Sequence, residues 1–170
     1  MITLFSENFK QFSQDSYDRE VRRAQIHRLR CSFCRHAGCL RIHGYYYRTV
    51  WTPSGPVRLR ILRLICSCGK THAVLLSSFV PYSRVSVCDH VKIISCASSG
   101  EAVARTESEI PLISEWSIRN IRRNFSRFWK ERLRSAGTEL LPMDSLVKSS
   151  FRDFFRQFMK IHRGPNILFS

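Results

Sequence analysis

The chain of 170 residues is long enough for one domain or two small ones, and its 44% hydrophobic and 12% aromatic side chains exclude global disorder. Lys and Arg total 28 against 13 Asp and Glu, a formal net charge of +15 that favours nucleic acid as partner over a merely soluble basic surface or a patch for anionic lipid. No stretch reaches the roughly 18 apolar residues of a membrane span, and the start of the chain lacks the pattern of a secretion signal, so we expect a cytoplasmic protein without membrane association.

Residues 1–30 predict a helical segment that packs on the next part of the chain. Asp15 or Ser16 is a candidate cap for a short helix, with Tyr17, Val21 and Ala24 on one side. The sequence does not indicate a specific function for this segment.

Two short cysteine pairs come next, Cys31 with Cys34 and Cys66 with Cys68. In a chain without an export signal, such pairs indicate a metal site more than a disulfide framework. Their separation is typical of a zinc ribbon over residues 31–82, in which two loops hold one Zn²⁺ between four thiolates. The second pair is one residue shorter than usual, which leaves open a substitute ligand or reduced cysteines buried without metal. The candidate substitutes are His36, Cys39, His43 and His72.

The segment between the cysteine pairs predicts a β-hairpin. Residues 40–51 are rich in Tyr, Val and Thr, residues 57–66 alternate apolar and Arg side chains, and residues 52–56 supply a turn with two prolines and a glycine. Residues 71–76 predict a third strand of an antiparallel sheet. On the hairpin, the candidate nucleic-acid contacts are His43, Tyr45, Arg48, Arg58 and Arg60.

Residues 83–137 predict a helical region. Residues 87–97 and 101–105 have helical character, and a longer helix over residues 115–135 begins after a Ser114 cap. On this helix, basic side chains gather opposite the apolar face with no acid expected among them, which indicates contact with phosphate more than a solvated surface. The order of elements predicts a helix-turn-helix. The candidate nucleic-acid contacts here are Trp116, Arg119, Asn120, Arg122, Arg123, Arg127, Lys130 and Arg134.

The C-terminal part, residues 138–170, predicts an amphipathic helix over residues 144–162 with a broad phenylalanine-rich face. Such a face either closes the core, which is the expectation, or forms a seam with a second copy or another protein. The fold predicted for the whole chain is therefore α+β: a zinc-ribbon hairpin within a three-stranded antiparallel sheet, a helix-turn-helix region and a C-terminal helix.

Several short runs resemble the N-terminal zinc ribbon of bacterial insertion-sequence transposases. They are the Cys31–Cys34 pair, residues 43–48, 63–66, 71–75 and 80–83. The chain is more similar still to short, uncharacterised proteins of Gram-positive bacteria that carry this ribbon without a catalytic domain. The resemblance covers residues 31–135 and implies a bacterial DNA-binding module whose cysteines hold zinc. The one-residue spacing of the second pair and the missing glycine after Cys34 depart from the usual pattern.

Catalysis is not expected, because the thirteen acids are scattered and no glycine-rich phosphate loop is present. The function predicted is a non-catalytic, zinc-dependent binder of double-stranded DNA, as a mobile-element-associated or regulatory factor. Two alternatives stay open. One is an RNA- or ribosome-associated ribbon protein, since exposed aromatics such as Tyr45 and Tyr47 also suit RNA. The other is an adaptor that binds a catalytic protein partner.

Overall fold

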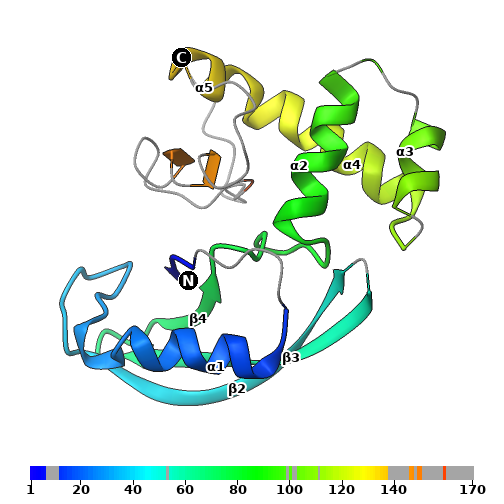
Figure 1. Cartoon of the computed structure of the whole chain (residues 1–170). Helices are drawn as coiled ribbons and strands as arrows, with labels where there is room; N and C mark the ends of the chain where they lie inside the picture. Colours follow the sequence, from blue (N-terminus) through cyan, green and yellow to red (C-terminus); the bar gives the residue numbers. More distant parts are fainter. Residues whose placement is uncertain are drawn as a thin grey trace.

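The computed structural model describes residues 1–6, 12–52, 54–98, 100, 103–110 and 112–137, together with residues 146, 147, 149, 150 and 159. Over these residues the chain is a mixed α+β protein in which a four-stranded sheet and a group of helices form two adjoining halves (Figure 1). The strands are β1 (Ile2–Leu4), β2 (Leu40–Thr52), β3 (Gly55–Cys66) and β4 (Thr71–Leu76). The helices are α1 (Gln14–Arg23), the short η1 (Ile26–Arg28), α2 (Val87–Ser98), α3 (Val103–Glu109), α4 (Glu115–Phe128) and α5 (Lys130–Ser135).

The predicted hairpin is the longest feature of the sheet. Strands β2 and β3 pair in antiparallel register from Thr52 opposite Gly55 to Leu40 opposite Cys66. The turn is tight, because Gly55 adopts a φ of +115° and the Thr52 hydroxyl donates to the Gly55 carbonyl oxygen over 2.8 Å. At the opposite end, the pairing returns Cys66 to the start of β2 and so brings the two cysteine pairs to one end of the hairpin.

Strand β4 pairs antiparallel to β3, as predicted, but the sheet also contains a strand that was not predicted. Strand β1 lies parallel to β4, with Ile2 opposite Val74, and the strand order is β1-β4-β3-β2. The expectation of only helical structure before residue 31 is therefore wrong at the start of the chain. Three residues are too few to show the alternation by which a strand is recognised.

Side chains of helix α1 bond the part of the β3 edge that β4 leaves unpaired. Strand β4 pairs with β3 only over residues 63–65, and beyond them the Tyr17 hydroxyl accepts from the Leu62 N–H and donates to the Val74 carbonyl oxygen, both over 2.9 Å. The Gln14 side chain bonds both the N–H and the carbonyl of Arg60, over 2.7 and 3.2 Å. The helix begins after Ser13, whose hydroxyl accepts from the Ser16 N–H, and not at the predicted cap.

The helical half has its own apolar core. Ile93 and Ile94 of α2 pack with Ile118 of α4 and with Trp129, all of them buried. The predicted helix over residues 115–135 is interrupted at Trp129, whose backbone (φ −125°, ψ −33°) separates α4 from α5. Helix α3 spans Val103–Glu109, further along the chain than the predicted 101–105. None of the described helices has the length and apolar character needed to cross a membrane.

The predicted C-terminal helix lies largely outside the described residues. Three of its apolar side chains are described, those of Leu146, Val147 and Met159. All three are buried and belong to the core of the helical half. These positions therefore contribute to core closure, which was the expected role of the segment.

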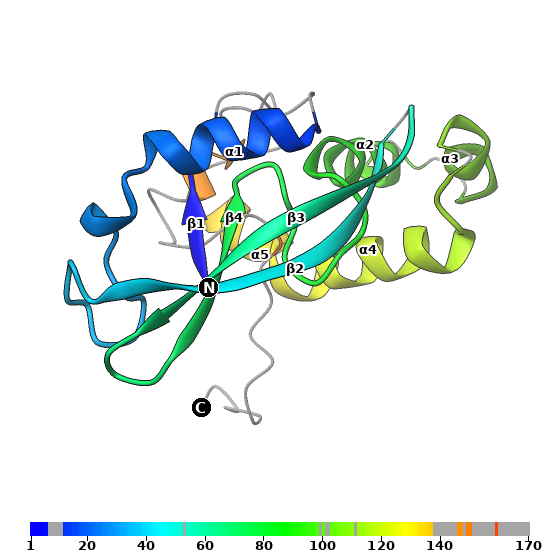
Figure 2. The same ribbon diagram turned by 90° about the horizontal axis from the view of Figure 1, so that it is seen from below.

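The two halves meet at residues 77–86, between β4 and α2. The Arg48 guanidinium of β2 donates to the carbonyl oxygens of Val80 and Ser83 over 2.6 and 2.5 Å. The Trp51 N–H donates to the Arg84 carbonyl oxygen over 2.7 Å, so the turn end of the hairpin lies beside the start of α2 (Figure 2). These bonds fix the connecting segment against the sheet.

Candidate metal centre and basic surfaces

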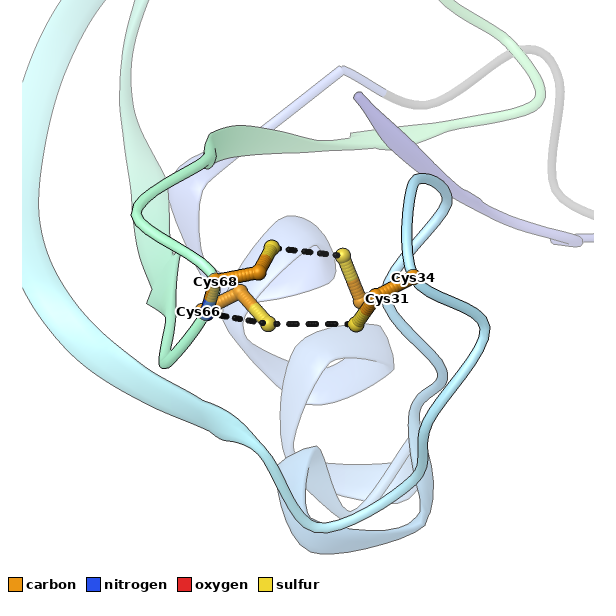
Figure 3. Close-up of side chains that lie close together, drawn as sticks. All are labelled: Cys31, Cys34, Cys66 and Cys68. Atoms are coloured by element: carbon orange, nitrogen blue, oxygen red, sulfur yellow. Dashed lines mark hydrogen bonds between the residues drawn. The ribbon is translucent and has the colours of Figure 1, made fainter.

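Four cysteine side chains converge at the end of the hairpin opposite its turn (Figure 3). The sulfur atoms of Cys31, Cys34, Cys66 and Cys68 all lie within 4.8 Å of one another. The Cys31–Cys68 and Cys34–Cys66 sulfur distances are 3.8 and 3.6 Å. A tetrahedral metal with bonds of about 2.3 Å to each thiolate places the sulfurs about 3.8 Å apart. As predicted, these four cysteines lie close enough together to bind a metal ion.

Each cysteine pair lies on a tight loop, and the two loops are built alike. In the first, the Arg35 N–H donates to the Cys31 carbonyl and the Cys31 N–H to the His36 carbonyl, both over 3.0 Å. In the second, the Gly69 N–H donates to the Cys66 carbonyl and the Cys66 N–H to the Lys70 carbonyl, both over 2.9 Å. The second loop repeats the bonding of the first with one residue fewer. The shorter cysteine spacing is thus accommodated by a tighter turn, without a substitute ligand.

The residue after the second cysteine of each loop has a left-handed backbone. Gly69 has a φ of +79°, and Arg35 has a φ of +67° at the equivalent place. Glycine adopts this conformation without strain, whereas a side chain at Cβ makes it costly. The glycine expected after Cys34 is therefore replaced by an arginine that takes the same conformation.

Backbone N–H groups point at two of the sulfur atoms and favour the thiolate, the form that binds metal. The Cys68 N–H lies 3.5 Å from the Cys66 sulfur and is the main reason that the pKa of Cys66 is lowered to about 6. Burial raises the pKa of Cys31, but the N–H groups of Cys34 and Phe33 outweigh it and bring that pKa down to about 7. The loops therefore favour the thiolate at Cys31 and Cys66, whereas the pKa of Cys34 is raised and that of Cys68 is raised to about 11, despite the backbone N–H groups of His36 and Lys70.

Two of the four candidate substitutes contact the quartet from outside. The His72 Nε2 atom lies 3.2 Å from the Cys31 sulfur, and its Nδ1 atom lies 3.3 Å from the Ser32 hydroxyl. The Cys39 sulfur lies 3.2 Å from that of Cys66 and donates to the His36 carbonyl. Among the described residues, none of the four candidates joins the group of mutually close ligand atoms. His72 is instead placed to orient a ligand, a role the sequence could not separate from ligation.

The basic residues predicted on the helix over 115–135 do not all share one surface. We call the exposed ones the basic ridge: Arg119, Arg123 and Arg127 on α4, with Lys130 and Arg134 on α5. Arg122 is half-buried and donates to the Thr106 hydroxyl of α3 over 2.6 Å, so it lies off the ridge. The expectation of a face without acids is wrong, because Glu115 forms an ion pair with Arg119 one helical turn away.

The hairpin residues also divide into two groups. Tyr45 and Tyr47 are 51% and 63% exposed, and the guanidinium groups of Arg60 and Arg58 lie 4.7 and 4.1 Å from the centres of their rings. These four side chains, with exposed His43, remain at the surface as candidate contacts. Arg48 differs, because it is half-buried against residues 80–83, and burial lowers its pKa. Its contacts are those of a residue that holds the two halves together.

No protein-family model, curated protein or solved structure matched this chain. Its function has to be inferred from the cysteine quartet and the basic surfaces themselves.

Proposed function

We propose that this chain is a zinc-dependent protein that binds double-stranded DNA and acts by binding, not by catalysis. The observation that carries the proposal is the basic ridge. Among the described residues of the ridge, only Arg119 has a carboxylate within ion-pairing distance. Four further positive charges line the outer face of α4 and α5, and the chain as a whole has a formal net charge of +15. Such an array suits the regularly spaced phosphates of a duplex.

Zinc is the metal that the quartet suits best. Four thiolates in a tetrahedral arrangement are typical of structural zinc, and they leave no coordination position open for a substrate. We therefore assign the centre to a zinc ribbon, in which the metal joins the two loops at the end of the hairpin. Its contribution to function would be indirect, by holding the sheet that supports the connecting segment and α2.

Helices α3 and α4 would form the helix-turn-helix, with α4 as the reading helix. Arg123 donates to the Asn120 side-chain oxygen over 2.9 Å, so the two side chains form one unit in the middle of α4. Arg and Asn are the side chains that most often pair with guanine and adenine edges. Arg127, Lys130 and Arg134 lie further along and would contact phosphates. This arrangement fits the recognition module of a mobile element or a regulatory DNA-binding factor.

The proposal includes no catalytic step, and the reason is the kind of metal site that the quartet forms. Among the described residues, the cysteine quartet is the only group of three or more His, Cys, Asp or Glu side chains close enough to share a metal ion. A two-metal nuclease or transposase centre would instead need clustered carboxylates. The quartet has no open coordination position, so we assign it no reaction.

Binding to RNA is a second candidate, favoured by one observation. Tyr45 and Tyr47 are exposed side by side on β2, and aromatic rings on a sheet are the usual platform for single-stranded bases. Arg60 and Arg58, however, already stack on these rings and occupy part of their surface. The hairpin therefore offers guanidinium groups to phosphates more readily than bare rings to bases. An adaptor role toward a protein partner has no comparable support among the described residues.

The test is equilibrium competition between duplex DNA, single-stranded DNA and structured RNA at equal salt. We expect duplex DNA to bind most tightly, and Arg127→Ala to reduce the slope of log affinity against log salt by about one. Arg63→Ala removes the same charge from an exposed position on β3, away from the ridge, and should leave the slope unchanged. Preference for RNA over duplex DNA, or equal effects of the two variants, would reject the ridge as the duplex-binding surface.

A further inference from the structure

A groove lies between α4 and the segment that joins the two halves. Its volume is about 530 Å³, within the range of about 300–1,000 Å³ that is usual for sites that take small molecules or parts of them. We call it the α4 groove. The side chains that give the groove its chemistry are Trp116, Asn120 and Asn124 of α4, Tyr82 and Arg84 of the connecting segment, and His90 of α2.

Two large aromatic side chains stand at the rim of the groove. Trp116 is 72% exposed and Tyr82 is 79% exposed, although rings of this size are normally covered in a folded protein. Tyr82 has a φ of +62°, a strained conformation for a residue with a side chain, and strain of this kind collects at functional sites. Rings of this type on both sides of a groove are suited to stacking against a flat ligand.

The groove also offers hydrogen-bonding groups of both kinds. His90 is 2% exposed, and its Nδ1–H donates to the Ser86 carbonyl oxygen over 2.8 Å, which leaves the Nε2 atom as an acceptor. Burial lowers the pKa of His90 to about 4, so the ring is neutral near pH 7. No described residue donates to Nε2. Asn120 has its oxygen engaged by Arg123, and its amide NH₂ group is left as a donor.

Among the described residues that line the groove, Arg84 is the one with a charged side chain near pH 7. Arg84 is exposed at one wall, and Arg123 of the basic ridge is bonded to Asn120 at the other. Among the described residues, no Asp or Glu lines the groove. A ligand that carries a negative charge next to a flat, hydrogen-bonding ring would match all of these features, and a nucleotide has both parts.

We propose that the α4 groove takes a single nucleobase that has left the base stack of the nucleic acid bound along the basic ridge. The base stacks against Trp116 and Tyr82, its polar edge meets His90 and Asn120, and its phosphate lies toward Arg84. This inference rests on the proposed function, because the ridge must first bring the strand to the groove. Taking a base out of a duplex costs a few kcal/mol, and least when the base is already unpaired. The protein should therefore prefer DNA that contains an unpaired base.

The experiment compares two duplexes of the same sequence, one fully paired and one with a single extra unpaired base, in equilibrium competition at fixed salt. Wild-type protein should bind the second duplex roughly 5- to 150-fold more tightly, the range that stacking of one base on aromatic side chains supplies. Tyr82→Ala and Trp116→Ala should each lose most of this preference. Tyr82→Phe keeps a ring and should retain it. Lys130→Ala lies on the ridge and should weaken both duplexes equally, so the preference should survive.

The outcomes separate this inference from the proposed function. If wild-type protein binds both duplexes with equal affinity and the expected salt dependence, the nucleobase site is wrong and duplex binding by the ridge stands. If neither duplex binds, the proposed function fails and the site falls with it. If the preference exists but Tyr82→Ala and Trp116→Ala both retain it, the unpaired base is held elsewhere and the assignment of the α4 groove is overturned.

Discussion

The sheet half and the helical half of this molecule are held together by different interactions. In the helical half, side chains such as Ile93, Ile118 and Trp129 form a continuous apolar core. In the sheet half, the apolar core extends along β3 and β4, but the end of the hairpin is closed by the cysteine loops. Cys31 and Cys66 are buried in this core, whereas Cys68 is exposed and Phe33 in the first loop is 67% exposed. One half is therefore closed by burial of apolar surface, and the other ends in addition in a cysteine quartet that lies close enough together to bind a metal ion.

The two halves therefore differ in how their exposed charged groups are supported. Without metal, the pKa values of Cys34 and Cys68 are raised, so these two side chains are thiols that join the loops only through sulfur contacts of 3.6 and 3.8 Å. The proposed metal would replace these contacts by four bonds to thiolates. The helical half needs no such ion and can present the basic ridge on a preformed surface. The connecting segment, fixed by Arg48, carries the order of one half to the other.

The largest effect should come from the metal centre. Cys34→Ser removes one ligand, and we expect loss of metal and unfolding of the cysteine loops, because structural zinc contributes on the order of 10 kcal/mol to small metal-dependent folds. Elemental analysis should find about one zinc per wild-type chain and none in the variant. Cys96→Ser makes the same chemical change at a half-buried position in α2 and should keep the metal. A metal-free wild-type protein with ordered loops would contradict the proposal that a metal ion stabilises the sheet half.

The corresponding experiment on the helical half removes a side chain from its apolar core and leaves the cysteine loops unchanged. Trp129 is completely buried, and Trp129→Ala should lower the free energy of unfolding by about 3–5 kcal/mol, because it removes apolar contacts and leaves a cavity. Urea unfolding measures this change, and metal content should stay at the wild-type level. Trp116→Ala, an exposed tryptophan on α4, should change stability by only about 0.5 kcal/mol. Loss of metal from Trp129→Ala would show that the metal centre depends on the core of the helical half.

Acid should weaken the helical half through His90. Burial lowers the pKa of His90 from 6.5 to about 4, so between these values the unfolded chain binds a proton that the folded chain does not. Stability should therefore fall as pH decreases from about 6.5 to about 4, by up to about 3 kcal/mol. Hydrogen exchange of the α2 amides measures this local change. The same amides in His90→Gln should lack this pH dependence, and an unchanged profile in that variant would place its origin elsewhere.

The smallest effect concerns the two cysteine loops. Arg35→Gly should stabilise the first loop by about 1 kcal/mol, because glycine adopts the positive φ without strain. Gly69→Ala should cost a similar amount at the second loop, where an added Cβ meets no atom within 4 Å and the backbone conformation alone resists it. Thermal unfolding of the metal-loaded variants measures both changes. Opposite signs are expected, and equal signs would contradict the equivalence of the two positions.

Local patterns in the sequence predicted the parts of this fold that depend on near neighbours. The spacing of the cysteines predicted the quartet, the alternation in residues 57–66 predicted β3, and Ser114 was identified as the cap of α4, where its hydroxyl accepts from the Ser117 N–H. Each of these features is decided within a few residues or by one hairpin.

Features that depend on contacts between distant residues were missed. Arg48 is a charged residue of the kind that usually lies at the surface. Only the folded chain shows that it bonds the carbonyl oxygens of Val80 and Ser83. The amphipathic pattern of residues 115–135 continues through Trp129, although the helix is interrupted at that buried residue. Tyr82 lies in one of the runs that carry the resemblance, but neither it nor His90 was singled out as a contact, because the α4 groove that both line forms only when α4 lies opposite them.

The most direct test of the account is the salt dependence of binding to a fully paired DNA duplex by zinc-loaded protein. If the five side chains of the basic ridge each neutralise a phosphate, log affinity should fall with log salt with a slope of about −4.5. Replacing Arg127, Lys130 and Arg134 together by Ala should bring that slope to about −2. A duplex affinity that does not change with salt, or a slope that the triple variant leaves intact, would contradict DNA binding through the ridge.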